Sequence, residues 1–152
     1  MECEAVLRPV GDPEGLAWAL ILRGLAAWRM SDRVGAAGSL RESLRGFQSL
    51  GHLWGLSACL FLAGQLAGAR GEHERAVSLL GAAEALRESI GVALLPSATA
   101  WLDASVAQAR TALGTATFDR AWQAGRSMTP DVAVADAERE IDLAEQPPRR
   151  TG

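Results

Sequence analysis

Apolar residues recur along this chain at intervals of three and four, broken by short runs of glycine, proline and acidic residues. This spacing places an apolar stripe along one side of a helix, and no strand-like alternation survives beside it. The pattern therefore predicts an all-helical chain. We expect helices over about residues 13–30, 33–50, 53–70, 72–90, 98–113, 115–127 and 130–145.

Capping residues support these boundaries. Asp12 precedes Pro13, and Asp32 stands where the second helix should begin, so both carboxylates are expected to cap backbone N–H groups. Ser97 is expected to cap the helix that starts at about residue 98. Gly51 and Gly91 follow the ends of two helices, where a left-handed residue commonly closes the last turn.

A unit of 40 residues occurs twice, over about residues 16–51 and 56–91. Self-similarity at a fixed period is the mark of stacked helical repeats. The match includes glycines and joints as well as apolar positions, which two unrelated leucine-rich helices would not share. The matched pairs are Gly15/Gly55, Leu16/Leu56, Leu20/Leu60, Leu22/Leu62, Gly24/Gly64, Ala36/Ala76, Leu40/Leu80, Leu50/Ile90 and Gly51/Gly91.

Small residues inside each copy predict a close approach of paired helices. Gly24 and Ala36 are expected to face each other across the first pair, as Gly64 and Ala76 do across the second. A Gly24→Leu substitution should separate the pair and cost several kcal/mol by overpacking.

The repeat also predicts the organisation of the chain. Residues 10–15 align with 50–55, so the chain is expected to start within a further repeat. The expected segments are 1–12 as the remnant of a preceding repeat helix, 13–51 as repeat 1, 52–91 as repeat 2, 92–145 as C-terminal capping helices and 146–152 as a disordered tail.

Composition narrows the function. Hydrophobic residues make up 49% of the chain and the net charge is −3, with all 15 basic residues being arginine and spread along the sequence. We therefore expect no nucleic-acid contact, and the acidic start and absence of a long apolar run predict a cytoplasmic protein without a membrane span. Cys3 and Cys59 are isolated, so neither a disulfide framework nor a metal site or cofactor is expected.

Gly24, Ala27, Ala36 and Leu40, with their counterparts 40 residues later, resemble tetratricopeptide repeats. The period of 40 exceeds the usual value of about 34, leucines occupy the usual aromatic positions, and the usual terminal proline is missing. Residues 76–91 and 112–126 are similar to the C-terminal region of bacterial LuxR-type and related signal-transduction ATPase transcriptional regulators. The resemblance implies a helical-repeat sensor or scaffold region. The ATPase and DNA-binding activities do not transfer, because the chain lacks a phosphate-binding lysine and a basic recognition helix.

The expected fold is therefore an all-α, right-handed, tetratricopeptide-like solenoid of about seven antiparallel helices with C-terminal capping helices. The expected function is non-catalytic: the module binds a protein or peptide partner, which includes a second copy through its exposed first helix. An obligate homodimer is the alternative. A small helical enzyme is a further one, and it predicts clustered titratable groups that the sequence does not show.

The first helix of each pair is expected to line the concave face, where aromatic residues and one arginine would anchor a partner. The competing interpretation is that these side chains pack in the core, which we also expect for Trp101 and Trp122 in the cap. The acidic residues of the last helix are interpreted as a solvated face. The candidate partner-binding residues are Trp18, Ile21, Leu25, Trp28, Arg29, Phe61 and Gln65.

Overall fold

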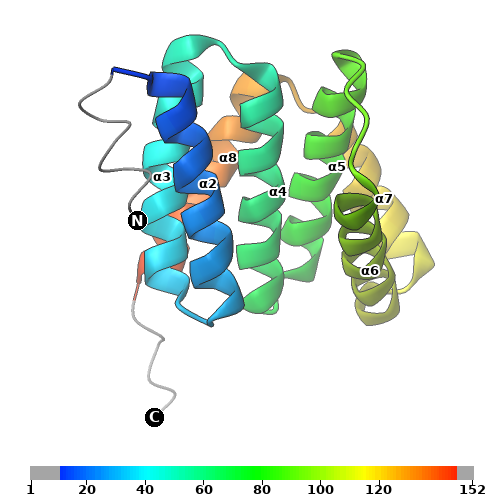
Figure 1. Ribbon diagram of the computed structural model, residues 1–152. Coiled ribbons are helices and arrows are strands. Elements are labelled where there is room, and N and C mark those ends of the chain that lie inside the picture. Colours follow the sequence, from blue (N-terminus) through cyan, green and yellow to red (C-terminus); the bar gives the residue numbers. More distant parts are fainter. Residues whose placement is uncertain (1–10, 147–152) are drawn as a thin grey trace.

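The computed structural model describes residues 11–146, which form seven α-helices and no strand (Figure 1). The predicted all-α class is confirmed, whereas the right-handed solenoid stays a prediction. The expected repeat remnant and disordered tail lie, apart from residues 11, 12 and 146, outside the described residues. The helices are α2 (Pro13–Arg29), α3 (Arg33–Leu50), α4 (Leu53–Ala69), α5 (His73–Ser89), α6 (Pro96–Leu113), α7 (Thr115–Arg126) and α8 (Pro130–Glu145).

Side-chain caps start four of these helices, and in α8 the Thr129 hydroxyl accepts a hydrogen bond from the Val132 N–H at 3.4 Å. The carboxylate of Asp12 accepts a hydrogen bond from the Gly15 N–H at 2.9 Å, and Asp32 accepts one from the third residue of α3 at the same distance. The imidazole Nδ1 of His52 accepts the equivalent bond in α4 at 3.0 Å. The expected cap at Ser97 is wrong: α6 begins earlier, at Pro96, because the fixed φ of proline suits the first helical turn.

The turns repeat with the same period as the helices. Ser31 and Gly71 both adopt left-handed backbone conformations, with φ of 62° and 81°, and they connect α2 to α3 and α4 to α5. Gly51 and Gly91 follow α3 and α5, with φ of 61° and 69°. Because the joints at Ser31 and Gly71 are so short, α2 and α3 run antiparallel to each other, as do α4 and α5 (Figure 1).

The small residues allow the close approach that the sequence predicts. A Cβ atom on Gly24 would lie 3.0 Å from Leu62 Cδ2 and 3.4 Å from Ser39 Cβ, so α2 has no room for a larger side chain there. A Cβ on Gly64 would lie 3.1 Å from Leu80 Cδ2. Each glycine therefore forms a notch that a leucine of a neighbouring helix fills.

Matched positions of the repeat differ sharply in burial at one place. Leu62 is 0% exposed because α4 packs against both helices of the first pair, and its side chain reaches the Gly24 notch. Leu22, its counterpart 40 residues earlier, is 66% exposed. Leucine at the same repeat position is thus a surface residue in the first copy and a core residue in the second.

Two glycines bring α7 against α5. A Cβ atom on Gly81 would lie 2.6 Å from the Trp122 carbonyl oxygen, and one on Gly125 would collide with the Ser78 backbone. The two backbones are therefore in direct contact. On the same helix, the indole of Trp122 stacks on Phe118 with ring centroids 5.8 Å apart.

The last helix, α8, returns across the molecule and lies against α3 and α4 (Figure 1). The expectation of a solvated acidic face on α8 agrees with the exposure of Asp131, Glu138, Asp142 and Glu145, but it is wrong for Glu140, which is completely buried. Its two oxygens accept hydrogen bonds from Arg70 at 2.8 and 2.9 Å, and Asp136 pairs with Arg75 at 3.3 Å. Burial raises the pKa of Glu140, although Arg70 opposes the shift.

A second ion-pair group holds the other end of α8. Arg41 of α3 donates to Asp142 and Glu145, each at 2.8 Å. These acids therefore face α3 and its charge, which explains why a strongly acidic helix can lie along the body of the molecule.

Candidate functional site

A groove lies between α6 on one side and α2 and α4 on the other, and residues of α5 also line it. It holds two pockets, which we call the upper and the lower pocket, with volumes of about 170 and 310 Å³. Pockets of this kind are the usual place for a ligand or a partner side chain. The upper pocket is lined by Ile21, Leu25, Trp54, Ser57, Ala58, Phe61, Ala83, Glu84, Arg87, Leu94, Ala98 and Trp101.

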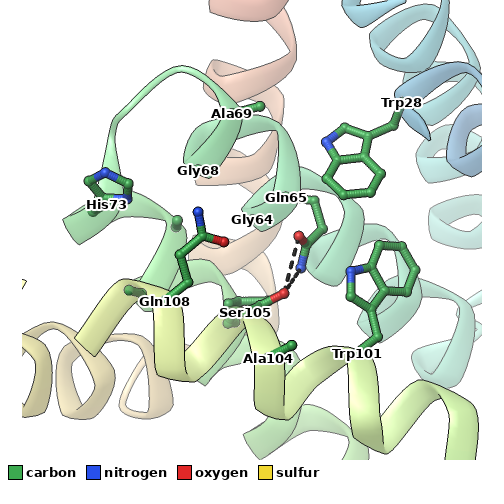
Figure 2. A pocket seen from close by; sticks show the side chains of 13 residues that line it. Trp28, Gly64, Gln65, Gly68, Ala69, His73, Trp101, Ala104, Ser105 and Gln108 are labelled. Atoms are coloured by element: carbon green, nitrogen blue, oxygen red, sulfur yellow. Dashed lines mark hydrogen bonds between the residues drawn. The ribbon is translucent and has the colours of Figure 1, made fainter. Parts of the chain in front are cut away.

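The lower pocket has a mixed lining of aromatic, small and uncharged polar side chains (Figure 2). Neither a carboxylate nor a guanidinium group lines it, and His73 is its single titratable residue. It is lined by Trp28, Gly64, Gln65, Gly68, Ala69, His73, Ala76, Leu80, Trp101, Ala104, Ser105, Gln108 and Ala109.

Trp101 of α6 separates the two pockets. Its indole lies 5.4 Å from Trp28, centroid to centroid, and 4.8 Å from the ring of Phe61, which it meets edge-on at 83°. All three rings are half-buried, so each keeps part of its surface open to a partner. Figure 2 shows Trp28 and Trp101 facing each other at one end of the lower pocket.

A mutual hydrogen bond connects α4 to α6 beside these rings. The Gln65 amide nitrogen donates to the Ser105 hydroxyl at 3.0 Å, and that hydroxyl lies 3.3 Å from the Gln65 amide oxygen (Figure 2). Gln65 is therefore satisfied although it is only 8% exposed. The side chain of Gln108 shows no such bond in the described residues and borders the same pocket.

An ion pair shapes the wall of the upper pocket. Arg87 pairs with Glu84 at 2.8 Å and also donates to the carbonyl oxygen of Val92 in the loop before α6. The hydrogen bonds that Arg87 donates to Glu84 raise the pKa of Arg87, so its guanidinium group stays charged at any physiological pH. Arg87 thereby fixes the loop that carries the chain from α5 to α6.

The structure brings together most of the candidate residues predicted from the sequence. Ile21, Leu25 and Phe61 line the upper pocket, and Trp28 and Gln65 line the lower one. Arg29 lies just beyond, in an open pocket that it shares with Trp28. Trp18 lines neither pocket: its ring is 4.9 Å from Phe47 and 4.7 Å from Trp54, which lines the upper pocket.

Two residues of α6, Trp101 and Ser105, complete the groove and were not predicted to belong to it. The signal that could have found them is the 40-residue period. Trp101 stands 40 residues after Phe61, and Ser105 stands 40 residues after Gln65. The expectation that Trp101 packs in a terminal cap placed it away from the residues that it touches.

The titratable side chains of the described residues form no recognisable metal site. No group of three or more His, Cys, Asp or Glu residues arranged for a metal ion is found in residues 11–146. Cys59 is buried, and this burial raises its pKa to about 12. His52 is held by its capping role and by Glu14, whose carboxylate lies 3.2 Å from Nε2.

Comparison with known proteins relates the chain to bacterial regulators. A stretch of 98 residues is 38% identical to proteins of Mycobacterium bovis and Mycobacterium tuberculosis that are named HTH-type transcriptional regulators. It covers 64% of this chain but only 11% of the relatives' length. No family model matches the chain, and no solved structure matches it.

This comparison overturns one expectation. The absence of nucleic-acid contact was inferred from the even spread of arginine, yet regulators of the helix-turn-helix class bind DNA. The expectation is therefore wrong. The matched stretch is only 11% of the relatives' length. The charge pattern of this chain therefore carries no information about the parts of those relatives that lie outside the match.

Among the described residues, no helix combines the length and the apolar character needed to cross a membrane.

Proposed function

We propose that this chain is a non-catalytic helical module of a regulatory protein, and that the groove between α2, α4 and α6 binds a peptide segment of a protein partner. The relation to proteins named transcriptional regulators supports the regulatory setting. A cytoplasmic location, where bacterial transcription is controlled, is part of this proposal. The tetratricopeptide-like and LuxR-type character of the module belongs to the same proposal.

One observation carries this proposal: three half-buried aromatic rings, Trp28, Phe61 and Trp101, meet at the boundary of two pockets. Aromatic side chains in pockets are the residues on which binding energy concentrates at protein interfaces. Uncharged polar groups beside them, such as Gln108, can bond a peptide backbone without the cost of desolvating a charge.

The module as a whole supports binding in preference to catalysis. The polar groups nearest the rings, Gln65 and Ser105, bond each other, and in the described residues neither has a hydrogen bond to a base that would activate it. The upper pocket is mainly apolar, and its charged groups, Glu84 and Arg87, neutralise each other. Such a lining suits an apolar side chain of a partner.

The test is selection of a displayed peptide library on the purified chain, followed by affinity measurements on the selected peptides. Ala104→Trp places a bulky ring in the lower pocket from an exposed position on α6. Ala112→Trp is the matched control, because Ala112 is also exposed on α6 and lines neither pocket. We expect binding to fall at least about tenfold in the first variant and to persist in the second.

Circular dichroism establishes that both variants keep their helices. If the library yields no binding peptide, or if Ala104→Trp leaves every affinity unchanged, the groove is not the partner site.

A further inference from the structure

Most arginines of residues 11–146 form ion pairs with carboxylates. Within residues 11–146, ion pairs of 4.0 Å or less involve every arginine except Arg29, Arg33 and Arg45. In a chain of net charge −3, an unpaired guanidinium is therefore the exception. Two of the three exceptions lie side by side at the end of the groove.

Arg29 and Arg33 line one open pocket together with Trp28, Ser31 and Ala69. We call this pocket the arginine corner; its volume is about 490 Å³. Arg29 is exposed and Arg33 is half-buried, so both guanidinium groups are reachable from solvent.

The acid closest to the corner in sequence does not neutralise it. Asp32 stands between the two helices, but its carboxylate is turned to the start of α3, where it accepts a hydrogen bond from the Gly35 N–H at 2.9 Å. No salt bridge joins Asp32 to Arg29 or Arg33 in the described residues. The two positive charges therefore remain available.

Local electrostatics explains only one of the two arginines. Arg29 lies in the last turn of α2, where a positive charge stabilises the negative end of the helix dipole. Arg33 is the first residue of α3, at the positive end of a helix dipole, where a cation is unfavourable. The two guanidinium groups thus supply positive charge to a pocket that no carboxylate lines, and this favours an anion.

The arginine corner is continuous with the lower pocket, since Trp28 and Ala69 line both. An occupant of the groove therefore meets the rings of Trp28 and Trp101 first and the two guanidinium groups next. We propose that the partner segment is an acidic peptide, in which an apolar or aromatic side chain enters the lower pocket and neighbouring carboxylates pair with Arg29 and Arg33. This inference rests on the proposed function.

The test compares two rhodamine-labelled, N-acetylated and C-amidated peptides, Ala-Phe-Leu-Glu-Glu-Ala and Ala-Phe-Leu-Gln-Gln-Ala, by fluorescence polarisation. Solvent-exposed pairs each contribute little, so two of them should make the acidic peptide bind about fivefold more tightly. Raising the salt from about 50 mM to about 300 mM should remove most of this preference, because salt screens exposed charges.

Variants assign the preference to its residues. The double variant Arg29→Gln/Arg33→Gln should bind both peptides equally, whereas Arg45→Gln, which removes the third unpaired arginine away from the groove, should keep the preference. Circular dichroism controls for folding.

The outcomes separate the two proposals. If both peptides bind equally and Ala104→Trp still blocks them, the acidic preference is refuted and the peptide groove stands. If neither peptide binds while library-selected neutral peptides do, the acidic preference is refuted again. If no peptide of any kind binds, both proposals fail. Binding of a DNA duplex that competes with the acidic peptide and needs the same two arginines would assign the corner to nucleic acid and overturn the peptide assignment.

Discussion

The pair Leu22 and Leu62 allows a direct measurement of what stacking contributes to stability. Both are leucines at the same position of the 40-residue unit, but Leu62 is 0% exposed and Leu22 is 66% exposed. Truncation of a fully buried leucine to alanine costs about 2–5 kcal/mol, through lost burial and the cavity that remains. The exposed leucine has about a third of its surface to lose, so Leu22→Ala should cost about 1 kcal/mol or less.

The assay is urea unfolding followed by circular dichroism. Leu62→Ala should lower the unfolding midpoint strongly at an unchanged slope, because the free energy changes but the surface exposed on unfolding does not. Leu22→Ala should lie close to the wild type. Equal costs for the two substitutions would refute the stacking described for Leu62.

A double-mutant cycle tests the notch itself. Gly24→Ala alone gains helix propensity but places a methyl group 3.0 Å from Leu62 Cδ2, so its net effect is small or unfavourable. In the Leu62→Ala background the clash is gone, and the same substitution should stabilise by about 1 kcal/mol. The two free energies should therefore differ by a coupling of about 1 kcal/mol; additive effects would show that the notch and the leucine do not meet.

Three further predictions follow from the described contacts. Gly125→Ala should destabilise the protein by about 3 kcal/mol or more, because its methyl group would collide with Ser78. Gly38→Ala, which points into open space on α3, should stabilise it by about 0.5–1 kcal/mol. Melting temperatures of the two variants test both expectations. In a Cys3→Ser background, Cys59 should react with a thiol reagent at pH 8 only after unfolding, because its pKa is about 12. Because the folded pKa of Glu140 is raised above the ordinary 4.5, the wild type should lose free energy of unfolding relative to Glu140→Gln as the pH rises from 4.5 through that raised value; parallel pH profiles would contradict this.

Local patterns in the sequence were sufficient for the helices and for their pairing. Capping at Asp12 and Asp32, the left-handed glycines and the notch at Gly24 are all properties of neighbouring residues or of the repeat, so the period reveals them. The start of α6 was misplaced because Ser97 and Pro96 compete as start signals, and a helix can begin at the proline.

Distant contacts were beyond the reach of such patterns. A glutamate with charged neighbours indicates solvent, and the buried position of Glu140 is tolerable only because Arg70, 70 residues away, and Arg75 pair with it. For the same reason only part of the groove could be predicted. The walls formed by α2 and α4 follow from the repeat, whereas the contacts of Trp101 with Trp28 and Phe61 depend on how α6 crosses α2 and α4.

Because α8 is synthesised after α3 and α4 and packs back against them, these helices are incompletely covered during translation. The faces of α3 and α4 that α8 covers are synthesised roughly 60 to 100 residues before it, and at about 5–20 residues per second they stay uncovered for about 3 to 20 s. During the same interval Arg70 and Arg41 lack their ion-pair partners Glu140, Asp142 and Glu145. Nascent chains therefore pass through a stage in which an apolar seam flanked by arginines is open to chaperones, and translation speed through α6 and α7 sets how long that stage lasts.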